Sequence, residues 1–325
     1  MHNGLVSVFG GSGFVGRQVV RALARDGWRI RVPMRRPHLG QDLKVAGTVG
    51  QVQLMQANLR FPDSVDRALE GADAVVNLVA LLHETGKQTF QALHVDGAEA
   101  LAWACARRGI TNVAHISAIG ADPDAASDYS RTKGEGERVV REHVPTADIL
   151  RPSIIFGEGD GFFTRFAGLA GFAPALPLIG GGRTRFAPAY VADVADAVAA
   201  VLQRGTTGTT YELAGPAEYT FRELMQFTLA TIDKRRLLVP VPWFAAKPLG
   251  LAGELAGKAP FVEPFLTRDQ VETLKVDNVP SGEHPGFAAL GIEPSTIEAI
   301  VPDYLERFRK YGQFHDQRSP APYRQ

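Results

Sequence analysis

The 325-residue chain has one cysteine, no net charge and no long hydrophobic run, and each absence excludes a class of protein. Cys105 alone cannot build a disulfide framework or a cysteine metal site, which favours a reducing compartment. The 35 basic and 35 acidic residues balance, so bulk charge predicts no nucleic-acid partner. No run of about eighteen apolar residues occurs, so we expect no membrane-spanning helix.

Two further absences concern targeting and metals. The first predicted strand begins by Leu5, which leaves no room for a signal or transit segment, so we expect none. The histidines have no metal-ligand spacing, and we expect structural or surface roles for them and no metal site. The histidines considered are His83, His94, His115 and His143.

Apolar runs and helical patterns alternate through the first half of the chain. After a first run at 5–9, strands are predicted at 29–34, 51–56, 74–80, 112–117 and 147–152. Helical patterns separate them, near 14–25, 62–70, 88–108 and 128–143. This alternation predicts an α/β fold with a Rossmann-type, doubly wound parallel sheet.

The pattern changes after Pro152. Gly/Pro-rich loops, a helix near 191–203, a short strand at 210–215 and further helices follow, which indicates a smaller α/β lobe interleaved with the sheet. We therefore assign residues 1–152 to a Rossmann-type domain and 153–312 to a C-terminal lobe. The polar segment 313–325 is predicted to be a disordered tail.

The stretch VFGGSGFVG, near the start, is typical of a phosphate-binding loop. Gly10 would permit the tight turn, Gly13 would let a pyrophosphate approach, and Gly16 would allow close helix–strand packing. Phe14 and Val15 begin the following helix, whose free N–H groups attract anions. The alternative is a glycine-rich turn without a ligand.

Two arginines, Arg35 and Arg36, follow the second predicted strand. An acidic residue at this place would bind the adenosine ribose of NAD, whereas a guanidinium pairs with a 2′-phosphate. The sequence therefore predicts NADP(H) as the cofactor. The alternative is a solvated basic turn.

Ser117, Tyr129 and Lys133 form a candidate catalytic set. Tyr129 and Lys133 lie one helical turn apart, where the ammonium would stabilise the phenolate and make tyrosine a usable acid or base. Ser117 ends a predicted strand, where its hydroxyl would hold a substrate carbonyl near the phenol.

Together, the glycine loop, the strand-end serine and YSRTK (129–133) resemble the short-chain dehydrogenase/reductase superfamily, and FAPAYVADVADAV (186–198) resembles its extended, epimerase-like branch. Phe9, where many extended members have threonine, suits the atypical subgroup better. The resemblance implies a cofactor-binding set beyond the glycine loop and the two arginines. Its members are Asn58, Leu59, Asn77, Ala80, Tyr129, Lys133, Pro152 and Ile154, and Pro152 to Ile154 would lie near the nicotinamide.

The second half of the chain resembles a narrower family. PVPWFAAKPLGLAGEL, PFVEPFLTRDQVETLKVDN and PGFAALGIEPSTIEAI are similar to the dinucleotide-binding accessory subunit of respiratory complex I, the alpha-subcomplex subunit 9 family. That resemblance implies tightly held NADPH, docking on the peripheral arm near the membrane and the quinone entrance, and no established turnover. Because mitochondrial members begin with a targeting peptide, we expect a bacterial homologue, peripheral on the cytoplasmic side of the inner membrane.

Two features are open to more than one interpretation. Residues 239–261 combine Trp243 and other apolar residues with lysines, which suits either an interfacial helix on a membrane or core packing of the lobe. Arg183 and Arg185 follow a GGG turn and either bind a substrate phosphate or carboxylate or belong to a solvated loop.

Three functions are therefore considered. The C-terminal resemblance favours an NADPH-binding accessory or assembly subunit of complex I. The alternative is an NADP-dependent oxidoreductase or epimerase that acts on a carbonyl, quinone-like or nucleotide-sugar substrate. The third, a cofactor-sensing regulator, requires a lost catalytic set, and retention of the serine, tyrosine and lysine counts against it.

Overall fold

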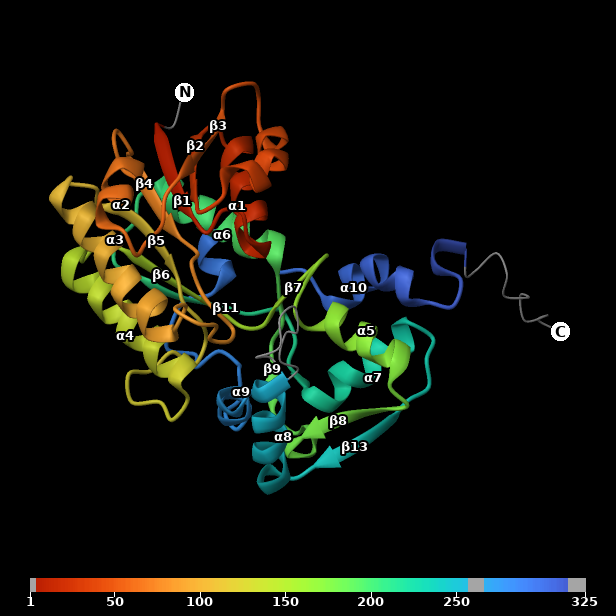
Figure 1. Cartoon of the computed structure of the whole chain (residues 1–325). Coiled ribbons are helices and arrows are strands. Elements are labelled where there is room, and N and C mark those ends of the chain that lie inside the picture. Colours follow the sequence, from red (N-terminus) through yellow and green to blue (C-terminus); the bar gives the residue numbers. More distant parts are fainter. Residues whose placement is uncertain (1–3, 257–265, 315–325) are drawn as a thin grey trace.

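The computed structural model describes residues 4–256 and 266–314, and it contains one large parallel sheet and a smaller lobe (Figure 1). Seven strands lie in the order β11-β6-β5-β4-β1-β2-β3, and every neighbouring pair is parallel. The strands are β1 (Leu5–Phe9), β2 (Arg29–Met34), β3 (Val52–Gln56), β4 (Ala74–Asn77), β5 (Asn112–Ile116), β6 (Asp148–Pro152) and β11 (Thr210–Leu213). The predicted Rossmann-type fold is confirmed.

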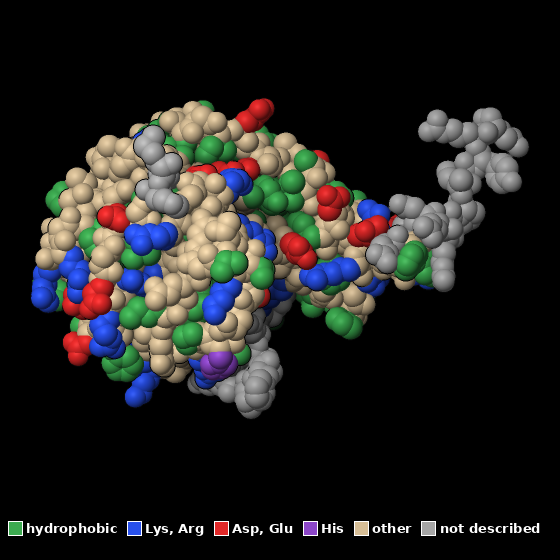
Figure 2. Space-filling model, turned by 90° about the horizontal axis from the view of Figure 1, so that it is seen from above, with side chains coloured by type: hydrophobic (Ala, Val, Ile, Leu, Met, Phe, Trp, Pro, Cys, Tyr) green, Lys and Arg blue, Asp and Glu red, His purple; other side chains and the backbone are tan. Residues whose placement is uncertain are grey.

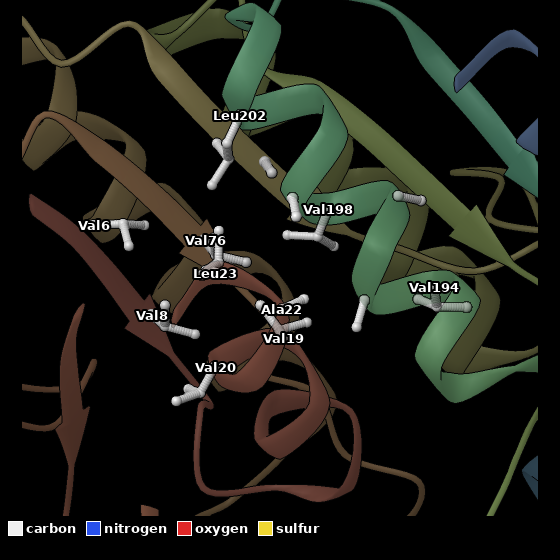
Figure 3. Packing of buried hydrophobic residues seen from close by; sticks show 14 of the residues in the cluster. Val6, Val8, Val19, Val20, Ala22, Leu23, Val76, Val194, Val198 and Leu202 are labelled. Carbon is white, nitrogen blue, oxygen red and sulfur yellow. The ribbon is translucent and has the colours of Figure 1, made fainter. Parts of the chain in front are cut away.

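Helices cover both faces of this sheet (Figure 1). One face carries α2 (Pro62–Ala68), α3 (Asp96–Arg107) and α4 (Asp128–His143), and the other carries α1 (Phe14–Arg25) and α6 (Val191–Arg204). Figure 3 shows valines of β1 and β4 packed against α1 and α6, which contribute fully buried side chains such as Val19 and Val198. Strands buried on both faces explain the continuous apolar runs in the sequence.

The helix predicted at 88–108 is divided in two. A π-helical turn, η2 (Gln91–Val95), precedes α3 and closes its hydrogen bonds one residue further along the chain than an α-helix does. Periodicity could not show this, because both segments continue the same apolar face. The turn brings His94 into the interior, where it reaches the candidate site.

The lobe is built from short strands and helices around an aromatic core, in which Phe162, Phe163 and Phe221 pack edge to face. Its strands are β7 (Ile155–Phe156), β8 (Ala175–Ile179), β9 (Arg185–Phe186), β10 (Ala189–Tyr190), β12 (Tyr219–Thr220) and β13 (Leu237–Val241). Its helices are α5 (Phe163–Phe172), α7 (Phe221–Thr231), α8 (Trp243–Ala256), α9 (Arg268–Thr273) and α10 (Ile297–Leu305).

The chain passes repeatedly between the lobe and the sheet. After α5, β8, β9 and β10, it returns to contribute α6 and the edge strand β11, and it then re-enters the lobe. A short helical turn, η4 (Phe287–Leu290), later packs Phe287 into the same core as α6. The interleaving follows from this path, since the sheet is complete only after β11.

The segment 239–261 is not one helix, so that part of the interfacial-helix interpretation is wrong. Val239 and Val241 belong to β13, which pairs with β8, and only then does α8 begin. Trp243 is half-buried and packs against a small hydrophobic cluster that is separate from the larger cores. It is therefore not an exposed aromatic anchor. Phe244, by contrast, is 82% exposed. Residues 257–261 lie outside the described residues.

Two further features complete the description. A disordered tail was predicted at 313–325. Its first residues belong to a helical turn, η6 (Gly312–Phe314), and residues 315–325 lie outside the described part. Among the described residues, no helix combines the length and the apolar character needed to cross a bilayer. On the face shown in Figure 2, basic and acidic side chains are interspersed.

Candidate functional site

The glycine loop joins β1 to α1, and its three glycines have different structural roles. Gly10 has a φ of +81°, which strains any residue with a side chain. A Cβ on Gly16 would lie 2.2 Å from the Gly10 carbonyl oxygen, so close packing requires this glycine. A Cβ on Gly13 would meet only that oxygen, at 3.3 Å. The protein itself therefore leaves space in front of Gly13, which suits a phosphate group.

The start of α1 is prepared for an anion. Gly13 is its N-cap without a side-chain hydrogen bond, and the first turn contains no acidic residue. The N–H groups of Phe14, Val15 and Gly16 have no carbonyl within the helix to bond, and the positive end of the helix dipole lies here. The loop therefore has the geometry of a pyrophosphate site.

The two predicted 2′-phosphate ligands lie at the carboxyl end of β2. Arg35 and Arg36 are both exposed, and one guanidinium nitrogen of Arg35 donates to Gln88 Oε1 at 2.8 Å. Among the described residues, neither arginine forms an ion pair with a carboxylate. Arg17, one turn into α1, is instead paired with Asp42. No carboxylate of these residues therefore competes with a phosphate for either arginine.

Four residues expected near the cofactor follow β3 and β4. Asn58 Oδ1 accepts a hydrogen bond from the Arg60 N–H at 3.1 Å, whereas Leu59 is packed into the core. Asn77 is buried at the end of β4, and Ala80 is exposed. The side chains of Leu59 and Asn77 therefore face the protein interior, and only their backbone remains for a ligand.

The structure places Ser117, Tyr129 and Lys133 as the sequence predicts, after β5 and on α4. Ser117 is 3% exposed, and its Oγ has no hydrogen-bond partner among the described residues. Lys133 is 2% exposed and donates from Nζ to the Ile116 carbonyl at 2.9 Å. An unpartnered buried hydroxyl is costly, so Ser117 Oγ is suited to hold a ligand atom.

The acid–base balance of this set differs from the expectation. We expected Lys133 to lower the pKa of the Tyr129 phenol. Burial, reinforced by the Asp269 carboxylate, instead raises the pKa of Tyr129 to about 12. Burial also lowers the pKa of Lys133 to about 8, against the opposing charge of Glu137. At neutral pH the phenol therefore keeps its proton and is suited to act as a donor.

Two buried histidines lie behind the set, and their involvement was not predicted. His94 Nε2 accepts from the Leu81 N–H at 3.0 Å, so Nδ1 carries the proton and donates to Thr132 Oγ1 at 3.1 Å. The His94 ring packs edge-on against Tyr129, with 5.5 Å between centroids. Burial lowers the pKa of His94 to about 2 and that of His115 to about 3, so both stay neutral.

The loop after β6, expected near the nicotinamide, is held by a residue that the sequence did not single out. Asn278 Oδ1 accepts from the Ser153 hydroxyl at 2.7 Å and from the Ile154 N–H at 3.0 Å. Its Nδ2 donates to the Ile119 carbonyl at 3.0 Å. Asn278 thereby ties Pro152–Ile154 to the loop after β5. The only signal was its place in the TRDQVETLKVDN segment.

The two arginines considered for substrate binding differ. Arg185 is paired with Asp277 at 2.8 Å and with Glu218 at 2.9 Å, so its charge is neutralised within the lobe. Arg183 is exposed. This geometry favours the solvated-loop interpretation for Arg185 and leaves Arg183 as the candidate.

The fold and site define a class of protein. The sequence model of the NAD dependent epimerase/dehydratase family matches residues 6–214, and the chain belongs to this family. The cofactor class is accordingly a nicotinamide dinucleotide, which the open space at Gly13 and the uncapped start of α1 fit.

The particular relatives are subunits of complex I. The 40 kDa subunit of NADH-ubiquinone oxidoreductase from Neurospora crassa is 33% identical over 93% of this chain and 79% of its own. The mouse (Mus musculus) alpha subcomplex subunit 9 of NADH dehydrogenase (ubiquinone) 1 is 32% identical over 94% of this chain and 81% of its own. A ceramide reductase from Caulobacter vibrioides is 31% identical over 74% of each chain.

Solved structures agree in fold. The dTDP-glucose 4,6-dehydratase DesIV of Streptomyces venezuelae, as a double mutant with NAD and DAU bound, superposes with a TM-score of 0.69 at 20% identity, covering 96% of this chain and 99% of that one. A UDP-glucose 4-epimerase of Thermus thermophilus, in complex with NAD, gives 0.61 at 21% identity, covering 83% and 99%. The shared architecture includes the lobe as well as the sheet.

Proposed function

We propose that the protein is an NADPH-holding accessory or assembly subunit of complex I, bound at the membrane-proximal peripheral arm on the cytoplasmic side of a bacterial inner membrane. One observation carries this proposal. The family match ends at residue 214, whereas the complex I relatives from Neurospora crassa, mouse and Arabidopsis thaliana align with 93–95% of the chain. Their similarity therefore extends into the part of the lobe that contains β13, α8 and α9.

Two features of the structure support the finer parts of the proposal. The exposed guanidinium groups of Arg35 and Arg36 favour NADPH, since each can pair with a 2′-phosphate. α8 exposes Phe244, Leu249, Leu251 and Leu255, an apolar set on one short helix that suits contact with a partner subunit or a membrane surface.

A second candidate, an NADP-dependent ketoreductase, is favoured by the retained Ser117, Tyr129 and Lys133 and by the ceramide reductase relative. Reduced nicotinamide, when bound, supplies the hydride. Ser117 Oγ would donate a hydrogen bond to the carbonyl oxygen of the substrate, and Tyr129 would give that oxygen its proton. Lys133 would hold the cofactor ribose and favour the phenolate left behind.

The two functions predict different effects of Tyr129→Phe relative to Gly13→Val. For a structural cofactor, Tyr129→Phe removes one hydrogen bond worth about 1 kcal/mol, whereas Gly13→Val removes the cofactor. Both variants are to be compared in the native host for complex I content and NADH-to-quinone rate, with near-normal values expected for Tyr129→Phe alone. Equal damage from the two variants would show that the bound nucleotide is a reactant.

A further inference from the structure

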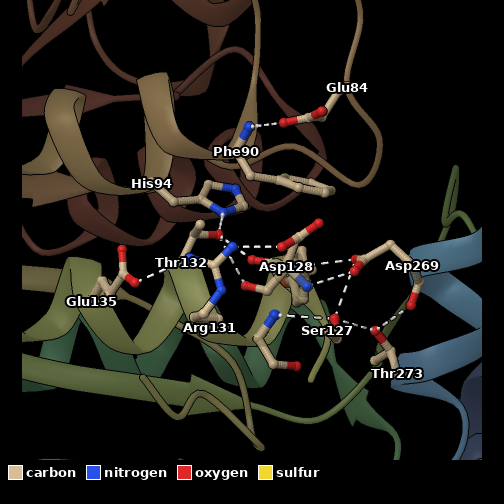
Figure 4. A network of polar contacts seen from close by, with 12 residues as sticks. Glu84, Phe90, His94, Ser127, Asp128, Arg131, Thr132, Glu135, Asp269 and Thr273 are labelled. Carbon is tan, nitrogen blue, oxygen red and sulfur yellow. Dashed lines mark hydrogen bonds and ion pairs between the residues drawn. The ribbon is translucent and has the colours of Figure 1, made fainter. Parts of the chain in front are cut away.

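α9 lies against the first turn of α4, although the two helices are far apart in the sequence (Figure 4). The Asp269 carboxylate accepts hydrogen bonds from the N–H of Asp128 at 2.6 Å, the N–H of Tyr129 at 3.1 Å and the hydroxyl of Ser127 at 3.2 Å. Thr273, one turn further along α9, places its Oγ1 2.8 Å from Ser127 Oγ. One carboxylate thus contacts three consecutive residues of α4 and its cap.

We propose that Asp269 is a positioning residue, which holds the first turn of α4 and through it the side chain of Tyr129. This inference concerns the internal geometry of the chain and does not depend on which proposed function is correct. The first N–H groups of a helix have no partner within the helix, and a negative charge at that end is favourable. Asp269 supplies both the partner and the charge from another part of the chain.

α4 has no other carboxylate available for this task among its described neighbours. Asp128, in the first turn of α4, is paired with Arg131 at 2.5 Å. Ser127 is the N-cap and accepts from the Ser130 N–H at 3.3 Å, a long bond. The short bond from Asp128 N–H to Asp269 is therefore the strongest constraint on where α4 begins, because charge-assisted bonds of this length exceed neutral ones in strength.

Asp269 is itself rigidly held. Thr267 and Gln270 form a capping box at the start of α9. α8 packs closely on that start, since a Cβ on Gly253 would lie 2.1 Å from the Leu266 carbonyl oxygen. Ion pairs from Lys247 to Glu272 and from Arg268 to Glu254, both at 3.0 Å, join the same two helices. The carboxylate is thus carried by a packed pair of helices.

The charge of Asp269 also acts on the phenol. It reinforces the effect of burial, which raises the pKa of Tyr129 to about 12. The other titratable groups packed around Tyr129 are His94 on η2, which stays neutral, and Asp128 and Lys133 on α4. Removing the carboxylate should therefore lower the phenol pKa, because one negative charge near the phenolate is lost.

The test compares Asp269→Asn with Glu142→Gln. The first is nearly isosteric, loses the charge and cannot accept all three hydrogen bonds. The second removes one negative charge from the last turn of α4, at an exposed residue that is paired only with Arg138 among the ion pairs of the described residues. The readouts are the Tyr129 phenol pKa, from NMR of ring-labelled tyrosine assigned with Tyr129→Phe, and the hydrogen-exchange rates of the Asp128 and Tyr129 amides.

For Asp269→Asn we expect a phenol pKa lower by at least about 0.3, a twofold change in the ionisation equilibrium, and about tenfold faster exchange of both amides. Glu142→Gln should change neither. An Asp269→Asn protein that keeps the wild-type phenol pKa and exchange rates would overturn the proposal.

A measurement on the wild-type protein covers the case in which Asp269→Asn does not fold. Burial raises the pKa of Asp269 above its usual value, and the carboxylate loses its charge as the pH falls. As the pH falls, the resonance of the Tyr129 amide proton should move upfield. The midpoint of this change should equal the titration midpoint of the Asp269 carboxyl carbon resonance. An amide resonance that does not follow that titration would overturn the proposal equally.

Discussion

The role of the glycine loop can be tested most directly by Gly13→Val. Gly13 has φ −78° and ψ −179°, an extended conformation that valine adopts readily. The new Cβ would meet only the Gly10 carbonyl oxygen, at 3.3 Å. We therefore expect the free energy of unfolding without cofactor to change by no more than about 1 kcal/mol.

The loss should appear when NADPH is added. A ligand present at a hundred times its Kd stabilises the folded state by about 2.7 kcal/mol, which corresponds to a rise in Tm of about 4 °C for a chain of this size. Gly13→Val fills the space that the pyrophosphate needs, so the variant should show no such rise. Thermal unfolding with and without NADPH, together with calorimetry for Kd, measures both quantities.

Two other glycines provide matched controls. Gly16→Ala would place Cβ 2.2 Å from the Gly10 carbonyl oxygen and should cost about 3 kcal/mol or more without any ligand. Gly168→Ala lies in α5, where Cβ would meet only Phe308 at 3.8 Å, and should keep the full NADPH response. If Gly13→Val binds NADPH with the wild-type Kd, the pyrophosphate lies elsewhere and the reasoning fails.

Two further predictions concern cofactor preference and pH. The double variant Arg35→Ala, Arg36→Ala should lose about 1.5–3 kcal/mol of its preference for NADPH over NADH in calorimetry, and an unchanged ratio of the two Kd values would remove the 2′-phosphate argument. Lys133, with a folded pKa of about 8 against an ordinary 10.5, binds fewer protons in the folded state between these values. Between pH 8 and pH 10, the free energy of unfolding of the wild type should therefore rise by about 2 kcal/mol relative to that of Lys133→Met, as measured by urea denaturation. If the two free energies change in parallel with pH, the lowered pKa of Lys133 is contradicted.

The bounds of helices and strands were predicted well where the local sequence pattern determines them. The predicted bounds 29–34 and 128–143 coincide with β2 and α4, because β2 alternates the buried Ile30 and Val32 with less buried residues and α4 begins directly after its serine cap, Ser127. The segment 239–261 could not be predicted in this way, since Val239 and Val241 form a strand only through pairing with β8. Composition alone contains no information about that partner.

In the candidate site, too, some residues could be identified from the local sequence and others could not. Ser117, Tyr129 and Lys133 could be identified because their spacing along the chain reflects one strand end and one helix face. Asp269 and Asn278 could not, because they reach the site across 140 and 125 residues of sequence. Their partners are mainly backbone N–H and C=O groups, which leave no residue type to recognise. The phenol pKa was mispredicted because burial, reinforced by the Asp269 carboxylate, raises it against the expected effect of Lys133.

The interleaved path of the chain also governs how the protein can fold during synthesis. β11 pairs with β6 across about sixty residues, joining Thr210 to Ile149, and much of the lobe lies between them. Until β11 has left the ribosome, β6 remains an apolar edge strand that other chains could pair with. We therefore expect a nascent chain stopped near residue 200 to depend on chaperones, whereas one that includes β11 closes the sheet edge and no longer does.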